Sequence, residues 1–411
     1  MINVETSTLE IVLAFLDQSV AENADVGTTA VSQALGCVLS ENLYSAASLP
    51  RFDNSAMDGY AIGQAVASVD GIVKLKVAHT IPAGDTKIIH LHAGEAAHIM
   101  TGARVPEGTG RIVMQEYAER DGEVVRLNVD RTSKPHIRRT GEDVPFGSKI
   151  VSRGTRLGPG HIALIQAAGV RTVRTIGKPK VALLSNGNEL VDGTDHLADG
   201  QIYDTNRPML RSMLVAAGAD VKDLGITEDE PRAVERALMS ATREHALIVS
   251  SGGASSGFAD HLMSALGRLG NVTFWKLNMR PGKPIGFGMI GECPILILPG
   301  NPVAAAAGFA IVGRVILRKL NGLAQGLEQR LRLPISRAFS LPRGRVQVLM
   351  ATLEPDATRG TLVSPLDDQG SASYTSLAKS QVLAILGPDR SDYRAGDLVD
   401  VIPLWETSDF A

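Results

Sequence analysis

The sequence predicts a multidomain protein of the α/β plus β class, and three patterns lead to that prediction. Over residues 179–321, apolar strand-like runs alternate with helical patterns, as in a mostly parallel sheet covered by helices. Over residues 49–134 the pattern is instead that of β-strands and turns, set between helical segments. After Leu331 the chain returns to short β-type runs, which predict a further β domain.

The composition is typical of a soluble globular protein. Of the 411 residues, 44% are hydrophobic and 21% are charged, and the net charge of −3 excludes a general attraction to nucleic acid or anionic membranes. Two cysteines, Cys37 and Cys293, are too few for a disulfide framework or a thiolate metal site. No basic signal segment and no long apolar run occur, so we expect a cytoplasmic protein without a membrane span.

Helical patterns flank the first β-rich segment. Ser7 and Glu10 form a capping box at the start of a helical pattern that continues to Val20. Further helical patterns cover residues 31–39 and 158–169. We therefore expect a discontinuous domain of residues 1–48 and 135–178.

The remaining segments complete the domain prediction. Alternation in VKLKV (73–77) and the Asp-Gly signal in RDGEVVRL (120–127) predict strands and a hairpin in an inserted β-rich domain, residues 49–134. Residues 179–327 form the predicted α/β domain. The runs RVQVLMATL and LVDVIPL predict strands of a C-terminal β domain, residues 328–411.

Four loops of the α/β domain follow predicted strands and carry polar residues; they cover residues 185–189, 227–229, 250–260 and 299–302. In an open parallel sheet, ligands bind where such loops meet helix N-termini. Glycines that expose backbone N–H groups, together with Glu189, Asp229 and Asp260, indicate a phosphate-bearing ligand with Mg²⁺. Taken singly, a glycine-rich loop is more often a tight turn, and Asp229 before a proline-led helix is more often an N-cap.

The stretch NMRPGKPIGFG (278–288) adds positive charge. Arg280 and Lys283 flank a Pro-Gly turn, and Lys276 lies just upstream. A solvated basic loop is the ordinary explanation of such a pair, but the surrounding prolines and glycines favour a shaped anion site.

Seven motifs occur in an order that resembles one family. They are FDNSAMDGYA, IMTGARVPEG, RRTGED, GQIYDTNR, SSGGASSGFADH, WKLNMRPGKP and LPGNPVAA. On these motifs the sequence resembles the molybdopterin molybdenumtransferase (MoeA) family, which includes the E-domains of gephyrin and of its plant counterpart. The resemblance covers nearly the whole chain.

The resemblance implies an elongated four-domain subunit. Its α/β domain is expected to have three layers, similar to the pterin-binding proteins MoaB and Mog, and its last domain to be β-barrel-like. The family's reaction joins adenylylated molybdopterin to molybdate and releases AMP with Mg²⁺ present. The expected partners are a second copy of the chain, which completes the active cleft, a molybdopterin adenylyltransferase and recipient apo-molybdoenzymes.

The resemblance also implies residue roles. The expected catalytic residues are Asp58, Thr101, Asp143, Glu189, Asp229 and Asp260, of which Glu189, Asp229 and Asp260 would also bind the metal. The expected substrate-binding residues are Arg138, Ser251, Gly252, Gly253, Ser255, Lys276, Arg280, Lys283, Pro299, Pro302 and Ser371.

Some positions depart from the family pattern. Arg280 stands where the family has Lys, and Asn186 and Asn188 stand where it has Thr and Asp. Met350 stands where the family has an Arg that touches molybdate, which predicts weaker molybdate binding. Two alternatives are a dimeric scaffold of the gephyrin type with weakened catalysis and a pterin-binding adenylyltransferase; the carboxylates argue against the first and the extra domains against the second.

Overall fold

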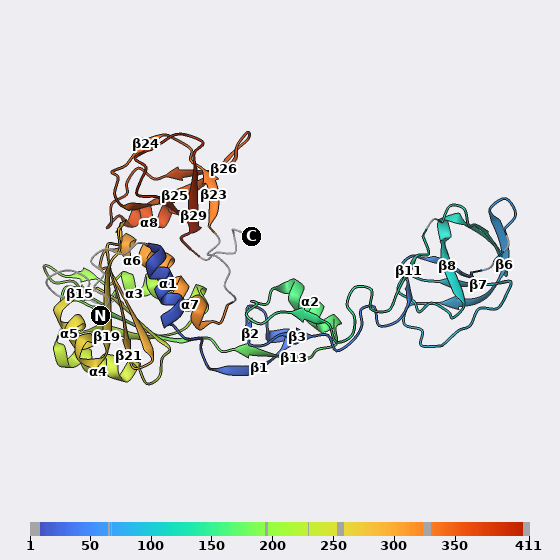
Figure 1. The fold of residues 1–411 in the computed structure, drawn as a ribbon, viewed down its shortest axis with the longest axis horizontal. Coiled ribbons are helices and arrows are strands. Elements are labelled where there is room, and N and C mark those ends of the chain that lie inside the picture. The colour runs from blue at the N-terminus through green and yellow to red at the C-terminus, as the bar shows by residue number, and fades with distance from the viewer. Residues whose placement is uncertain are drawn as a thin grey trace. The chain divides into compact units, whose positions relative to one another are not determined.

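The structure is a computed structural model that describes residues 9–405, except residues 65, 67, 133, 194–195, 229, 253–258 and 324–329. The chain forms two compact units (Figure 1). The large unit comprises Met1–Gly27 and Ile176–Ala411, and the inserted unit comprises Thr28–Thr175. In the described part of the chain, every helix is too short or too polar to cross a membrane.

The inserted unit is built around a six-stranded sheet with the strand order β8-β5-β7-β6-β10-β9. Its strands are β5 (Gly59–Gly63), β6 (Ile72–Ile81), β7 (Glu95–Ile99), β8 (Thr109–Met114), β9 (Ala118–Asp121) and β10 (Val124–Asn128). Leu75 and Val125 lie in the core on one face, whereas Ala97 and Ile112 lie in the core on the other. The predicted β-rich segment and its hairpin are confirmed, because β9 and β10 pair across the Asp-Gly turn.

A second group of shorter elements forms its own hydrophobic core. It contains β1 (Val26–Ala30), β2 (Val38–Leu39), β3 (Leu43–Tyr44), β12 (Lys149–Val151), α2 (Pro159–Ala167) and β13 (Thr172–Ile176). The helix predicted over residues 31–39 is wrong: a 3₁₀ turn, Val31–Gln33, is followed by β2. Gly36 has φ +78°, which ends the turn, and the Leu39 N–H donates to the Thr155 carbonyl instead of to its own turn.

The α/β domain of the large unit contains a six-stranded sheet with the order β17-β14-β18-β22-β21-β19. Its strands are β14 (Lys180–Asn186), β17 (Asp220–Thr227), β18 (Leu247–Ser251), β19 (Asn271–Lys276), β21 (Pro284–Ile290) and β22 (Cys293–Leu298). The first four strands in this order are parallel; β21 runs antiparallel to β22, and β19 runs antiparallel to β21, so β21 alone is reversed. The mostly parallel sheet is therefore confirmed.

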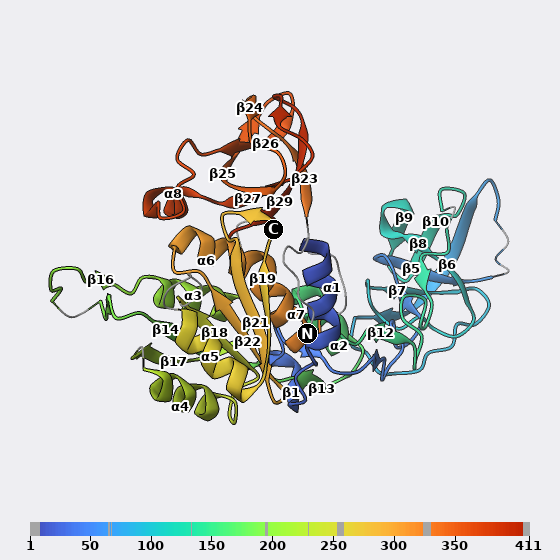
Figure 2. The same ribbon diagram turned by 60° about the vertical axis from the view of Figure 1, so that its left-hand side comes forward.

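Helices cover both faces of this sheet and give the predicted three layers (Figure 2). Ala182, Leu184 and Ile248 pack against α4 (Pro231–Ala241) and α5 (Ala259–Leu269). The opposite face of the sheet, which includes Leu183 and Val249, packs in a second core. The helices of this core are α3 (Asn206–Ala216), α6 (Pro302–Gly308) and α7 (Arg314–Leu320). A π-helical turn, Phe309–Gly313, joins α6 to α7.

The first helix, α1 (Leu9–Ser19), belongs to the large unit. Its residues Val12 and Leu16 lie in the core that α7 shares, and Lys319 forms a 3.0 Å ion pair with Asp17. The sequence instead grouped this helix with residues 158–169. Apolar residues at helical spacing predict a buried face, but they do not identify the surface that covers it.

The C-terminal domain is a sheet with the order β20-β25-β27-β29-β23, to which β26 is added beside β25. The bounds are β20 (Met279–Arg280), β23 (Leu331–Pro334), β25 (Val346–Asp356), β26 (Gly360–Pro365), β27 (Val382–Leu386) and β29 (Leu398–Pro403). Ile335, just after β23, bridges Val363 of β26, which closes the sheet as expected of a barrel-like domain.

The C-terminal sheet packs on the α/β domain. Val348 and Ile402 enter the same core as α6 and α7, while β20 pairs with β25 in parallel. Arg314 of α7 donates hydrogen bonds to the carbonyl oxygens of Pro403 and Leu404. The two domains therefore form one compact unit.

Candidate active site

The four predicted strand-end loops begin at the same edge of the α/β sheet. β14 ends at Asn186, β17 at Thr227, β18 at Ser251 and β22 at Leu298. The register pairs Asn186 with Thr227 and Ser251 with Leu298, so neighbouring strands end at the same level. Parallel strands thus bring four loops that are distant in sequence to one edge, as the sequence predicted.

A pocket of about 400 Å³ lies at this edge. Four of the predicted site residues line it: Glu189, Ser251, Gly252 and Pro299. Asn186, Asn206 and Tyr374 also line it, none of which was assigned a binding role from the sequence. The pocket is within the size range of small-molecule sites, which is about 300–1,000 Å³.

Gly252 starts the glycine-rich loop and has a backbone that requires glycine. Its φ is +89°, and a Cβ at this position would lie 2.4 Å from the carbonyl oxygen of Asn186. Its own N–H donates to the Leu298 carbonyl oxygen at 3.1 Å. Gly252 therefore brings its own backbone close to the end of β14, which a residue with a side chain would not permit.

Asn206, the first residue of α3, joins two of the loops. Its Nδ2 donates to the Ser251 hydroxyl oxygen at 2.8 Å and to the Gly300 carbonyl oxygen at 2.7 Å. Because one acceptor is a carbonyl, the orientation of the amide is determined by these contacts. The sequence signal was the motif GQIYDTNR, but an asparagine at a helix start is ordinarily explained as a cap.

Several buried polar atoms beneath the pocket have no hydrogen-bond partner among the described residues. They are Ser185 Oγ, Asn186 Oδ1, Asn206 Oδ1 and Ser250 Oγ. Each such atom costs about 1–3 kcal/mol when it is left unsatisfied. Three of the four lie at the ends of β14 and β18, and the fourth lies at the start of α3.

Arg207 holds the segment that carries Asn206. Its guanidinium forms ion pairs with Asp204 at 2.9 Å, Asp223 at 2.7 Å and Asp192 at 2.8 Å. Burial disfavours the charged form of Asp223, but the hydrogen bonds from Arg207 and the Gly225 N–H outweigh it, so the pKa of Asp223 lies below its ordinary value. Burial also disfavours the charged form of Arg207, but its three carboxylate partners outweigh this effect and raise its pKa.

The C-terminal domain contributes one side of the pocket. The Ser371 hydroxyl oxygen accepts from Asn301 Nδ2 at 3.2 Å, and its carbonyl oxygen accepts from the Val303 N–H at 3.1 Å. The Tyr374 hydroxyl is 2.8 Å from the Thr205 hydroxyl. Ser371, a predicted substrate-binding residue, is thereby placed against the loop that precedes α6; Pro302, another, is buried as the first residue of α6.

The basic turn adjoins the pocket. Arg280 and Lys283 are exposed, and neither forms an ion pair with any residue that the structure describes. Lys283 precedes Pro284, which lines the pocket. The backbone N–H of Leu277 donates to the Lys283 carbonyl oxygen at 2.8 Å, which shapes the turn.

Some predicted residues lie outside what the structure describes. Asp229, Gly253 and Ser255 are outside the described residues, and for Asp260 and Lys276 only the backbone is described, in α5 and β19. Their roles stay predictions.

Met350 is placed differently from the sequence interpretation. Its side chain is 1% exposed and lies in the core shared by α7 and β27. Gln369 accepts from the Met350 N–H and donates to its carbonyl oxygen, each at 2.9 Å, so this backbone is also engaged. The side chain at position 350 therefore faces the core in this structure, and the weaker molybdate binding expected from Met350 stays a prediction.

The inserted unit brings two predicted catalytic residues together. Asp58 Oδ1 accepts from the Thr101 backbone N–H at 2.6 Å and from its hydroxyl at 2.8 Å. These hydrogen bonds, the backbone one first, lower the pKa of Asp58. Arg138 is exposed in β11 (Ile137–Arg138), and Asp143 is exposed in the turn that follows, where its N–H donates to the Leu49 carbonyl oxygen at 3.0 Å.

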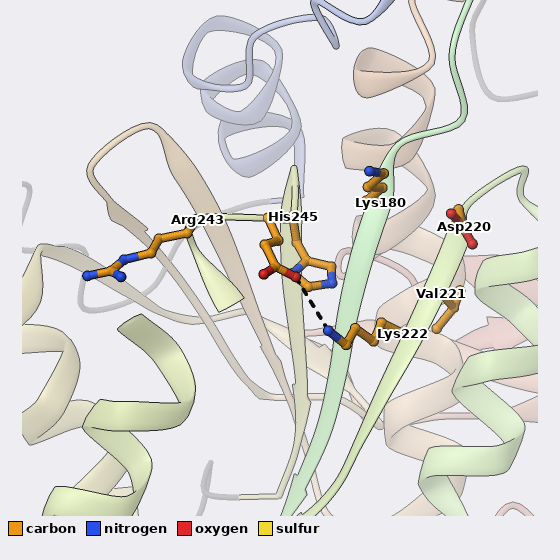
Figure 3. A pocket seen from close by; sticks show the side chains of 7 residues that line it. Lys180, Asp220, Val221, Lys222, Arg243 and His245 are labelled. Carbon is orange, nitrogen blue, oxygen red and sulfur yellow. Dashed lines mark hydrogen bonds and ion pairs between the residues drawn. The ribbon is translucent and has the colours of Figure 1, made fainter. Parts of the chain in front are cut away.

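A second hollow, of about 610 Å³, lies at the opposite edge of the α/β sheet (Figure 3). It is lined by Lys180, Asp220, Val221, Lys222, Arg243, Glu244 and His245. Lys222 and Glu244 form an ion pair at 3.4 Å, and Arg243 extends away from that pair (Figure 3). No residue of the predicted site lines this hollow.

Comparison with known proteins assigns the family. The molybdopterin molybdenumtransferase of Haemophilus influenzae is 32% identical over 380 residues, covering 91% of this chain and 92% of that protein. This chain belongs to the molybdopterin molybdenumtransferase family. Molybdopterin molybdenumtransferase 2 of Mycobacterium tuberculosis is 35% identical over 346 residues, covering 82% of this chain and 85% of that protein.

Three regional families match in succession. They are the MoeA N-terminal region (domain I and II) over residues 6–169, the probable molybdopterin binding domain over residues 182–319 and the MoeA C-terminal region (domain IV) over residues 332–404. The crystal structure of the molybdopterin biosynthesis MoeA protein from Pyrococcus horikoshii has a TM-score of 0.83 at 26% identity, covering 97% of this chain and 99% of that chain. The predicted multidomain α/β plus β fold class is thereby confirmed.

Proposed function

We propose that this chain is a molybdopterin molybdenumtransferase that inserts molybdate into adenylylated molybdopterin and releases AMP. One observation carries the proposal: the pocket at the carboxyl edge of the α/β sheet is lined by Glu189, Ser251, Gly252 and Pro299, within the region that matches the molybdopterin binding domain. The alternative of a dimeric scaffold with weakened catalysis is not favoured, because a scaffold has no need of buried, unpartnered polar atoms at such a pocket.

The residues of the pocket suit a phosphate-bearing substrate. Hydrolysis of the P–O–P link between the phosphate of molybdopterin and that of AMP consumes one water molecule. It leaves AMP and molybdopterin with its own phosphate. Such a reaction depends mainly on positioning and on neutralising charge at the phosphoryl oxygens. The loop that begins at Gly252 and the amide of Asn206 supply the positioning in this proposal.

One proposed metal ligand is described in the structure. Glu189 is exposed at the pocket, and its carboxylate oxygens are available to an ion there. Mg²⁺ prefers oxygen ligands and substrate phosphates. We assign Glu189, Asp229 and Asp260 as the metal-binding carboxylates; the ion, when bound, would neutralise phosphate charge.

Molybdate, a dianion and the second substrate, requires cations. Arg280 and Lys283 supply them in this proposal, since both are exposed and Lys283 precedes Pro284, which lines the pocket. The Arg280 guanidinium offers a planar pair of donors where lysine offers a point charge.

The remaining parts of the proposal concern assembly and location. We propose a cytoplasmic homodimer in which the inserted unit of a second copy supplies Asp58, Thr101, Arg138 and Asp143 to the site. A molybdopterin adenylyltransferase would provide the substrate, and apo-molybdoenzymes would receive the product.

The test uses the purified protein with adenylylated molybdopterin, molybdate and Mg²⁺. We expect AMP release that depends on molybdate, together with activation of an added apo-molybdoenzyme. AMP release without any activation of the apo-molybdoenzyme, or no AMP release at all, would contradict the proposal.

A further inference from the structure

Three exposed side chains with large apolar surfaces line the pocket. Ile202 is 53% exposed, Tyr203 42% and Tyr374 52%, and all three line the pocket. Ile202 and Tyr203 form β16 (Ile202–Tyr203), while Tyr374 begins α8 (Tyr374–Lys379) in the C-terminal domain. Exposed aromatic side chains beside a hollow are typical of surfaces that bind an apolar or planar group.

Tyr374 is held in place from both domains. Its hydroxyl is hydrogen-bonded to that of Thr205, the residue before Asn206, at 2.8 Å. The Ser373 side chain caps α8 by accepting from the Ser376 N–H. The contact between Ser371 and Asn301 fixes the preceding loop. The ring is therefore oriented before any ligand arrives, which lowers the entropy cost of binding.

The charges of the pocket indicate which part of a substrate lies beside this ring. Glu189 and Asp204 are its charged residues in the part of the chain that the structure describes, and no lysine or arginine lines it there. Asp204 is already paired with Arg207. No described lysine or arginine would attract a phosphate to the Tyr374 side of the pocket, whereas a neutral ring needs no cation there.

The floor of the pocket is polar. Asn186 and Asn206 line the pocket through side-chain amides, and Asn206 Nδ2 donates to Ser251 and Gly300. The Oδ1 of each amide is closed off from solvent, so it adds polar surroundings and no direct contact for a ligand. The pocket thus combines an aromatic rim with a polar floor.

We propose that Tyr374 is a substrate-binding residue whose ring stacks on the amino-substituted heteroaromatic ring of the substrate. Pterin and adenine both have this chemistry, and adenylylated molybdopterin contains both. The inference rests on the proposed function and deepens it by assigning a residue of the C-terminal domain to ring recognition.

The test measures binding directly and does not require turnover. The probes are AMP, followed by equilibrium dialysis, and 6-hydroxymethylpterin, which lacks a phosphate and is followed by its fluorescence. Stacking of a base on an aromatic side chain corresponds to roughly a tenfold loss of affinity when the ring is removed. We expect Tyr374→Leu to weaken one of the two probes by about that factor, and the affected probe identifies the ring.

Two variants separate the ring from other effects. Tyr374→Phe keeps the ring and removes the hydrogen bond to Thr205, so it should bind the same probe within about threefold of the wild type. Tyr44, which is 53% exposed in the inserted unit, provides a control, and Tyr44→Leu should change neither affinity. Thermal melting of each variant checks that it folds.

Three results would overturn the inference: wild-type protein that binds neither probe, Tyr374→Leu that binds both normally, or Tyr374→Phe that is as weak as Tyr374→Leu. The last would assign the effect to the hydroxyl. Tyr374-dependent binding in a protein that releases no AMP would leave the ring site intact and refute the proposed function alone.

Discussion

The two edges of the α/β sheet each carry a hollow, and their side chains differ in kind. The amino edge has the larger one, about 610 Å³, lined by exposed charged residues such as Lys222 and Glu244. The carboxyl edge has a pocket of about 400 Å³, with buried amides, a left-handed glycine and aromatic residues at its rim. Neither volume nor number of charges identifies the site.

The difference lies in which groups are already satisfied. At the amino edge, Lys222 pairs with Glu244, and the exposed side chains are solvated. At the carboxyl edge, Ser185, Asn186 and Ser250 are buried with side-chain oxygen atoms that have no described partner. The carboxyl edge is also where the four strand-end loops begin and where four predicted site residues line one pocket, which is why the smaller pocket is the better candidate.

The largest expected effect is on the free energy of unfolding, and it differs between the ion pairs at the two edges of the sheet. Arg207→Met should destabilise the large unit by about 3–5 kcal/mol, because it leaves Asp204 and its neighbours without their buried partner. Lys222→Met at the amino edge should change the free energy of unfolding by at most about 1 kcal/mol, since that pair is exposed. Urea unfolding of the two variants measures both; equal losses would contradict the comparison.

Glycine positions give the next contrast. Gly252→Ala places a Cβ 2.4 Å from the Asn186 carbonyl oxygen, and we expect AMP release to fall roughly 100-fold as the loop moves. Gly291 is the matched control, because it also has a positive φ, +60°, but has open space around it, in the turn before β22. Gly291→Ala should lower stability by about 1–2 kcal/mol and leave turnover near normal. Comparable loss of turnover in both variants would show that strain, and not the loop position, is responsible.

A smaller effect is expected on the pH dependence of stability. The pKa of Asp223 is lowered in the folded protein, so the contribution of this carboxylate is present above its ordinary value of 3.8 and is lost as the pH falls below that value. Acid unfolding, followed from pH 6 down to about pH 3, should be steeper in the wild type than in Arg207→Met, which lacks the cause of the shift. Identical profiles would show that the pair does not shift the pKa of Asp223.

The carboxyl-edge pocket could be predicted from the sequence because its placement follows from topology. Once residues 179–321 are taken as parallel strands and helices, the loops after β14, β17, β18 and β22 must begin at one edge. Glu189 and Gly252 stand in those loops, so their convergence required no knowledge of side-chain contacts.

The residues that were missed depend on contacts between distant segments. Asn206 has an ordinary local explanation as a helix cap, and its hydrogen bonds to Ser251 and Gly300 appear only when α3 lies beside two loops. Tyr374 approaches Thr205 from a different domain. The motif match at Met350 did not reveal that its side chain is buried, because a shift of one residue along a β-strand reverses the face.

The pocket's role is tested most directly by a pair of matched carboxylates at opposite edges. Glu189 lines the carboxyl-edge pocket, and Glu244 lines the amino-edge hollow; both are exposed, and Gln keeps the shape of each while removing its charge. Molybdate- and Mg²⁺-dependent AMP release should fall roughly 100-fold in Glu189→Gln, with a higher Mg²⁺ requirement, and stay within about twofold of wild type in Glu244→Gln. Normal turnover in Glu189→Gln, or an equal loss in Glu244→Gln, would contradict the assignment of the carboxyl-edge pocket as the active site.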